Sequence, residues 1–196
     1  MLSLKTFTLT IISLFFIACG STSDNAPTTT KGLTATALLK AERTTQDEIL
    51  VAINKARSIP RDCHDGQGIV PAAPALTWNN ELYASAYEHS VDLATSNTFS
   101  HYGSGTASDI TGSNNENQSY FIDRIEVNGY LNYTVIGENV AGGHESIDAA
   151  IAGWIISPAH CTNLMNSKFT EMGVAVATNN NSDYGIYWTQ SFGSKK

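Results

Sequence analysis

One stretch of the chain, Gly137–Asn163, holds a carboxylate, an imidazole and a thiol. Glu138 stands in a Gly-Glu-Asn turn, and His160 and Cys161 follow Pro158 after a helical pattern. A positioned imidazole or carboxylate can move a proton in catalysis, and both groups are ligands for divalent metals. We therefore expect this stretch to form one wall of a cleft.

Two residues outside this stretch complete the set of candidate ligands, since His101 lies well before it and Glu171 just after it. Zinc takes three or four N or O donors at about 2.0–2.2 Å. His101, Glu138 and His160 could supply three of them and leave a position for water, and Glu171 is a further candidate. In the alternative interpretation no metal is bound, and Glu138 orients a histidine within a hydrogen-bonded network.

The surrounding sequence predicts the helices and strands that position these side chains. Apolar residues at helical spacing predict helices over 45–59, from 80 to about 98, over 120–127, and from 147 to the interruption at 158. The expected N-caps are Thr45, Asn79 or Asn80, and Ser146. Strand patterns cover 135–140, 172–178 and 184–192, with a loop over 104–119. This order predicts an α+β fold with helices on both faces of a small antiparallel sheet.

Three large side chains in these elements are interpreted as core residues. His89 lies on the apolar face of the second predicted helix, where a histidine hydrogen-bonded to the backbone is the favoured interpretation and a ligand the alternative. Trp154 and Trp188 are expected in the core, with partners for their indole N–H groups.

The first residues of the chain have the pattern of an export signal. Lys5 precedes an apolar segment that is short for a membrane-spanning helix and ends in Phe16-Ile17-Ala18-Cys19-Gly20. This ending resembles a bacterial lipobox, so we predict a lipoprotein signal peptide over 1–18 and acylation of Cys19, for example with palmitate. The alternatives are an ordinary signal peptide and an uncleaved anchor.

Export also explains the other two cysteines. An exported protein enters an oxidising compartment, in which two cysteines can form a disulfide. We therefore predict a bond between Cys63 and Cys161. Closing a loop of about 100 residues stabilises the fold by on the order of 4–5 kcal/mol in the chain-entropy model. The alternative is a nucleophilic Cys161 beside His160.

Composition limits the class of protein and of partner. The 196 residues suit one domain, which we place at 38–196, after a disordered polar tether over 19–37. Eighteen acidic residues against 11 basic ones give a net charge of −7, so no basic stripe is available for nucleic acid. We expect a monomer in the cell envelope, attached to a membrane through Cys19. Where the cell has an outer membrane, we expect the attachment there. The alternative is a secreted protein.

Several motifs, in this order, resemble a bacterial member of the CAP superfamily of cysteine-rich secretory, antigen-5 and pathogenesis-related proteins. The motifs are LYASAYEHSVDLA at 82–94, FSH at 99–101, GENVAGG at 137–143, GWIISPAHCTNLM at 153–165, FTEMGV at 169–174 and YWTQSFG at 187–193. The resemblance covers about 41–193 and implies a three-layer α-β-α sandwich with a large open cleft.

The resemblance also implies a site, from which this chain departs at two positions. Eukaryotic members often carry two histidines and two acids able to hold a divalent metal. His101 and Glu138 match one of each, but Ser157 and Tyr187 stand where the second acid and second histidine would be. We expect His160, and Glu171 with it, to compensate.

Three functions are compatible with this sequence. The favoured one is a binding module of the cell envelope whose cleft holds a lipid, a peptide or an ion. The second is a metal-assisted hydrolase of peptide or peptidoglycan, with Glu138 as general base and His101 and His160 as metal ligands. The third is a structural envelope protein. The chain has no Ser in a G-x-S-x-G turn, which favours binding over serine hydrolysis.

Overall fold

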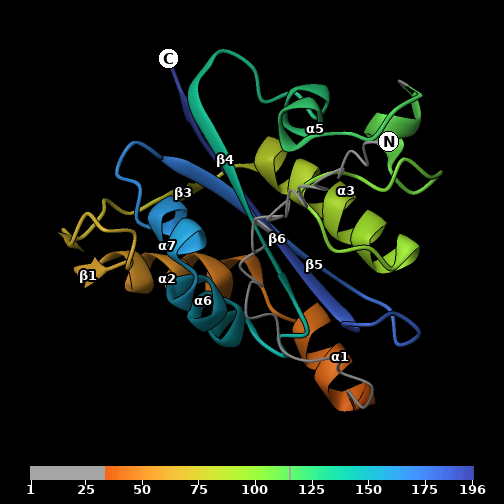
Figure 1. Ribbon diagram of the computed structural model, residues 1–196, viewed down its shortest axis with the longest axis horizontal. Helices are drawn as coiled ribbons and strands as arrows, with labels where there is room; N and C mark the ends of the chain where they lie inside the picture. The colour runs from red at the N-terminus through yellow and green to blue at the C-terminus, as the bar shows by residue number, and fades with distance from the viewer. Residues whose placement is uncertain (1–33, 115) are drawn as a thin grey trace, which may run out of the picture.

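The computed structural model describes residues 34–114 and 116–196 (Figure 1). The predicted signal peptide, the predicted lipidation site Cys19 and most of the predicted tether lie outside these residues. None of the helices in the described ranges is long and apolar enough to cross a membrane.

The described ranges contain seven helices and six strands. The helices are α1 (Ala35–Glu42), α2 (Gln46–Arg57), α3 (Asn80–Ser96), α4 (Ile110–Asn114), α5 (Phe121–Val127), α6 (Ile147–Ile156) and α7 (Pro158–Leu164). The strands are β1 (Arg61–Asp62), β2 (Ile69–Val70), β3 (Thr77–Trp78), β4 (Tyr133–Gly142), β5 (Glu171–Thr178) and β6 (Ile186–Lys195). Among these elements, β1 and β2 form a separate two-stranded ribbon.

The main sheet has the strand order β3-β5-β6-β4. The predicted hairpin is its centre, since β5 and β6 pair antiparallel from Glu171 opposite Gly193 to Thr178 opposite Ile186. Strand β4 pairs antiparallel with β6 and places Glu138 opposite Ser191, while β3 pairs parallel with β5. Strand β4 is therefore an edge strand, and its residues can contact helices on both faces of the sheet.

Helices cover both faces of this sheet. Figure 1 shows α3 and α5 on one side and α2, α6 and α7 on the other. The larger core fills the α2–α6–α7 side and includes Ile53, Trp154 and Trp188, whereas Leu93 and Tyr187 belong to a smaller cluster on the α3 side. This is the three-layer α-β-α arrangement of the predicted fold class, and the two tryptophans are buried as predicted, with their N–H groups bonded to the carbonyls of Val140 and His144.

The predicted N-caps of three helices are confirmed. Thr45 and Glu48 form a capping box at α2, the side chain of Asn79 accepts the N–H groups of Glu81 and Leu82 at α3, and Ser146 caps α6. Each cap satisfies N–H groups that the first turn of a helix leaves without an intrahelical partner.

Several elements differ from the predictions. Helix α1 begins at Ala35, within the predicted tether; α4 lies within the predicted 104–119 loop; β4 is longer than the predicted 135–140; and the two-residue β3 was not predicted. A strand as short as β3 has too few residues to show a periodic pattern. It forms because a partner strand that is distant in sequence, β5, lies beside it.

Two buried links hold α7 in place. The Cys63–Cys161 disulfide joins it to the loop that begins with β1. The buried guanidinium of Arg57 on α2 donates to the carbonyls of Leu164 and Pro74, and its burial lowers the pKa of Arg57 to about 10. Helix α7 carries His160, so both links also fix the backbone from which that imidazole projects.

Candidate functional site

The site forms around Glu138 on the edge strand β4. Successive residues of a strand point to opposite faces, so Glu138 points toward α3 and α5, whereas its neighbour Asn139 points toward α7. The Asn139 amide donates to the carbonyl of His160 at 3.2 Å. In return, the Asn163 amide of α7 donates to the Glu138 carbonyl at 2.9 Å. These bonds attach α7 to the strand that carries the acid.

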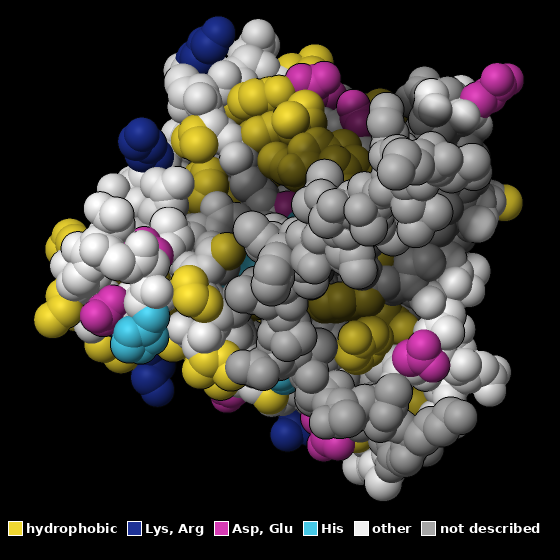
Figure 2. All heavy atoms as spheres, in the orientation of Figure 1, with side chains coloured by type: hydrophobic (Ala, Val, Ile, Leu, Met, Phe, Trp, Pro, Cys, Tyr) yellow, Lys and Arg dark blue, Asp and Glu magenta, His cyan; other side chains and the backbone are white. Residues whose placement is uncertain are grey.

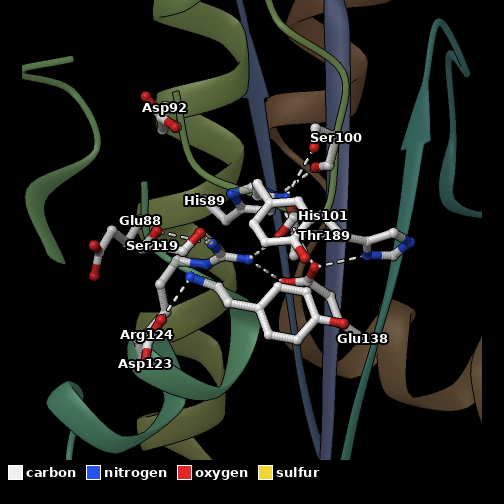
Figure 3. Close-up of polar contacts among 12 residues, drawn as sticks. Glu88, His89, Asp92, Ser100, His101, Ser119, Asp123, Arg124, Glu138 and Thr189 are labelled. Carbon is white, nitrogen blue, oxygen red and sulfur yellow. Dashed lines mark hydrogen bonds and ion pairs between the residues drawn. The ribbon is translucent and has the colours of Figure 1, made fainter. Parts of the chain in front are cut away.

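Both carboxylate oxygens of Glu138 are engaged (Figure 3). Oε1 accepts a hydrogen bond from Nδ1 of His101 at 2.9 Å, and Oε2 accepts one from Nη2 of Arg124 at 2.8 Å. The carboxylate is 1% exposed, as is the side chain of Arg124. A buried ion pair of this kind costs desolvation free energy that only close, well-bonded geometry offsets.

The surrounding charges keep Glu138 ionised. Burial alone would raise the pKa of its carboxyl, but the charges of His89 and Arg124 and the hydrogen bond from His101 outweigh burial and lower the pKa to about 2. Burial lowers the pKa of His89, against the raising effect of Glu138, so His89 carries its charge only at acid pH, where Glu138 also titrates. At neutral pH, Arg124 is the buried cation paired with Glu138.

Arg124 also fixes the backbone that presents His101. Its guanidinium donates to the carbonyl of His101 at 3.1 Å and to the carbonyl and hydroxyl of Ser119. The loop between these residues is held by Asp109, whose carboxylate accepts bonds from the N–H groups of Gly105, Gly112 and Ser119. His101 is thus placed by contacts to its main chain and its ring together.

His89 supports the same loop from inside. Its Nε2 lies 2.9 Å from the Ser100 carbonyl, next to His101 in sequence, and its side chain is fully buried. The predicted core histidine with a backbone partner is therefore confirmed. The same Nε2 also lies 3.9 Å from Oε1 of Glu138, which links the core of α3 to the site.

The two candidate imidazoles meet at the edge of β4. The ring centroids of His101 and His160 lie 6.0 Å apart with an interplanar angle of 41°. The His101 side chain is 40% exposed, and His160 is half-buried. Beside His101 in sequence, Tyr102 stacks on Tyr120 with ring centroids 4.8 Å apart, which adds an aromatic surface to the loop.

Comparison with known proteins identifies the fold family. The family model described as Cysteine-rich secretory protein family, CAP, matches residues 50–192. The chain belongs to the CAP family. A solved structure with a TM-score of 0.56 and 27% identity is an extracellular protein containing an SCP domain from Bacillus anthracis str. Ames, with 84% of this chain and 45% of that chain covered. An outer surface protein from Borrelia burgdorferi has a TM-score of 0.55 at 18% identity, over 78% of this chain and 96% of that one.

Curated relatives match shorter parts of this CAP chain. "Uncharacterized membrane protein YlbC" from Bacillus subtilis (strain 168) is 31% identical over 117 residues, which is 60% of this chain and 28% of the relative. "Uncharacterized protein YkwD" from the same organism is 32% identical over 62 residues, or 32% of this chain and 22% of the relative. The matches thus cover less than a third of either curated relative.

The CAP fold brings three of the four candidate ligands together and separates the fourth. His101, Glu138 and His160 lie around one point of β4. The Glu171 carboxylate instead accepts hydrogen bonds from the Tyr130 hydroxyl at 2.7 Å and the Asn79 amide at 3.1 Å. Glu171 starts β5, and β6 lies between β5 and β4, so we remove Glu171 from the proposed site.

The three remaining residues do not fit a zinc site in this arrangement. Glu138 directs Oε1 at His101 and Oε2 at Arg124, whereas zinc needs at least three donors directed at one point. Within the described ranges, no group of three or more His, Cys, Asp or Glu residues is arranged to hold a metal ion. The geometry matches the alternative interpretation, in which Glu138 orients a histidine.

Sequence reasoning missed Arg124, the strongest partner of Glu138. The predicted helix 120–127 carries apolar residues at helical spacing, and Arg124 lies among them. An arginine inside an otherwise apolar helix face signals a buried ion pair, because a lone buried charge is too costly. Nothing in the sequence says that its partner lies on β4.

Proposed function

We propose that this CAP domain is a ligand-binding module of the cell envelope, and that His101 and His160 contact the polar group of the ligand. One observation carries the proposal: a partly exposed imidazole is oriented by a buried carboxylate, with a second imidazole 6.0 Å away. Such an arrangement fixes which ring nitrogen faces outward, which is a property of binding and catalytic histidines.

The chemistry of the outward nitrogen follows from Glu138. A carboxylate with a pKa of about 2 is ionised at neutral pH and can only accept a hydrogen bond. His101 Nδ1 must therefore carry the proton, so in neutral His101 the outward Nε2 is an acceptor for an O–H or N–H group of the ligand. The stacked Tyr102 and Tyr120 rings favour a ligand with a flat or apolar part beside that group, such as a peptide or a lipid.

An envelope location rests on the relatives and on the chain's own start. One relative is named a membrane protein, and a structural neighbour is named an extracellular protein. The lipobox-like sequence ending at Cys19 would attach the domain to a membrane. These observations support a domain that meets its ligand outside the cytoplasm.

The hydrolase stays the second candidate because a carboxylate–imidazole pair is two-thirds of a catalytic triad. Its roles would differ from the predicted ones. Glu138 is buried and doubly bonded, so it would orient His101, and His101 would be the base. A structural role remains the third.

The test follows the imidazole NMR signals of the full chain during separate titrations with soluble peptidoglycan fragments, mixed short peptides, a short-chain phospholipid and zinc chloride. We expect one organic probe to shift the signals of His101 and His160 together. His101→Ala should weaken that binding at least tenfold, whereas His64→Ala, which removes an exposed histidine that lies beside Asp62, should not.

Other outcomes separate the alternatives. Breakdown of a peptide or peptidoglycan probe that is lost in His101→Ala would identify the hydrolase. Absence of any shift at His101 with every probe, or equal binding by His101→Ala and His64→Ala, would overturn the binding proposal.

A further inference from the structure

A second concave surface lies away from the histidines, between α1, α2 and the start of α6. It is a groove of about 810 Å³, within the usual range for small-molecule sites. Its lining comprises Thr36, Lys40, Arg43 and Thr44 from α1 and the following turn, Glu48, Val51, Ala52 and Lys55 from α2, and Ser146, Ile147 and Asp148 from α6.

This groove collects much of the positive charge that the surface has. The chain carries only 11 basic residues against 18 acidic ones, and on the face shown in Figure 2 the basic side chains are few and lie near the margin. Arg57 and Arg124 are buried, and Lys195 pairs with Glu81. Three of the remaining basic residues line this one groove.

The groove is lined by three cations and two acids, Glu48 and Asp148, which leaves it with a net charge of +1. Within the part of the chain that the structure describes, no ion pair involves Lys40, Arg43 or Lys55. Of the two acids in the groove, Glu48 is held by the capping box and accepts bonds from the N–H and hydroxyl of Thr45. The other, Asp148, lies in the first turn of α6, where the helix dipole favours a negative charge.

The positions of the cations suit a ligand with several acceptor oxygens. Lys40 and Arg43 are three residues apart, at the end of α1 and in the turn that follows it, while Lys55 approaches from α2. The hydroxyl of Thr36 adds a short donor. Val51 and Ile147 give the groove an apolar part, so the ligand can carry carbon next to its charge.

We propose that this groove binds a phosphate-bearing ligand through Lys40, Arg43 and Lys55. Lysine and arginine form charge-assisted hydrogen bonds to phosphate, which are shorter and stronger than neutral ones. The phosphate can come from a free phosphate compound or from the headgroup of a lipid. The groove shares no residue with the His101–His160 site, so either proposal can fail without the other.

The test measures binding to the full chain by calorimetry in two arms. One arm uses inorganic phosphate and the other uses dihexanoyl phosphatidylglycerol below its micelle concentration. The test variant is Lys40→Gln/Lys55→Gln. The matched control, Lys168→Gln/Lys196→Gln, removes the same charge from exposed positions outside the groove.

We expect saturable binding in at least one arm, weakened about 25-fold in the groove variant, since each cation near a phosphate contributes about fivefold. The control should bind within about twofold of the unmodified chain. Binding in the phosphate arm assigns the groove to free phosphate compounds, and binding only in the lipid arm assigns it to headgroups. Equal weakening by the two variants, or no saturable binding in either arm, overturns the proposal.

Discussion

At the scale of single residues, Glu138 is the centre of the site because it joins three elements. It connects β4 to Arg124 on α5 and to His101 in the loop after α3. The sequence pointed to Glu138, His101 and His160 through their chemistry, but it left open whether Glu138 binds a metal, acts as a base or orients a histidine. In the structure the oxygens of Glu138 accept hydrogen bonds from Arg124 and His101. The choice of these partners depends on the tertiary fold.

Replacement of Glu138 by Gln should destabilise the fold strongly. The change leaves the buried guanidinium of Arg124 without its counter-charge, which typically costs about 3–5 kcal/mol. Urea unfolding of the variant measures this cost, with Glu145→Gln, an exposed acid, as the control expected within about 0.5 kcal/mol of the unmodified chain. A loss below about 1 kcal/mol would mean that the ion pair is not buried as described.

The pH dependence of stability gives a second check on Glu138. Its folded pKa is about 2 against an ordinary 4.5, so its contribution is present above pH 4.5 and is lost as the pH falls toward 2, by about 3 kcal/mol. Burial also lowers the pKa of His89, so protonation of His89 begins to destabilise the fold as the pH falls below 6.5. Unfolding free energies measured from about pH 8 to about pH 2 should therefore fall in two steps, and Glu138→Gln should show a smaller lower step, since Asp109, whose pKa is also lowered, still titrates there.

At the scale of elements, the site depends on how α7 and α3 are attached to the sheet. The caps at Thr45, Asn79 and Ser146 were predictable, because a cap is decided by residues three positions apart. The position of Glu171 was not, because its neighbourhood depends on β6 lying between β5 and β4. Strand order is a long-range property that local pattern does not encode.

Loss of the disulfide should destabilise the fold and disturb His160. The bond closes a loop with a sequence separation of 98, and the double variant Cys63→Ala/Cys161→Ala should lose up to about 4–5 kcal/mol. Its imidazole NMR spectrum should show a larger change at His160 than at His101, since the disulfide attaches α7, which carries His160, and not the loop that carries His101. Unchanged stability on reduction of the unmodified chain would contradict this assignment.

Helix α3 packs closely against β5 at Gly173. A Cβ added at Gly173 would be 2.0 Å from the backbone nitrogen of Tyr83, and backbone cannot move aside as a flexible side chain can. Gly173→Ala should therefore cost about 1–3 kcal/mol or more through overpacking. A thermal midpoint equal to that of the unmodified chain would show that α3 does not pack this closely.

At the scale of the whole molecule, one CAP domain carries two candidate surfaces on a chain of net charge −7. The histidine pair lies at the free edge of the sheet, and the basic groove lies between helices on its α2–α6 side. The fold class followed from the order of helices and strands, whereas the groove had no signal in the sequence, because Lys40 on α1 and Lys55 on α2 line one groove only in the folded chain.

Helix α1 belongs to the domain, although the sequence placed the domain start at 38. Ala37 and Ala41 are buried, and Ala41 is part of the larger core. A fragment of residues 34–196 should therefore have a free energy of unfolding about 1–2 kcal/mol higher than a fragment of 44–196, because the shorter fragment loses apolar burial. Its urea midpoint should be higher accordingly. Equal midpoints would assign α1 to the tether instead.

The most direct test of the proposed site is the tautomer of His101, measured by long-range ¹H–¹⁵N NMR of the full chain at a pH where the ring is neutral. A buried, ionised Glu138 predicts a proton on Nδ1 and a bare Nε2 facing the ligand. A proton on Nε2 would contradict this, because Glu138 would then not orient the imidazole on which the proposed function depends.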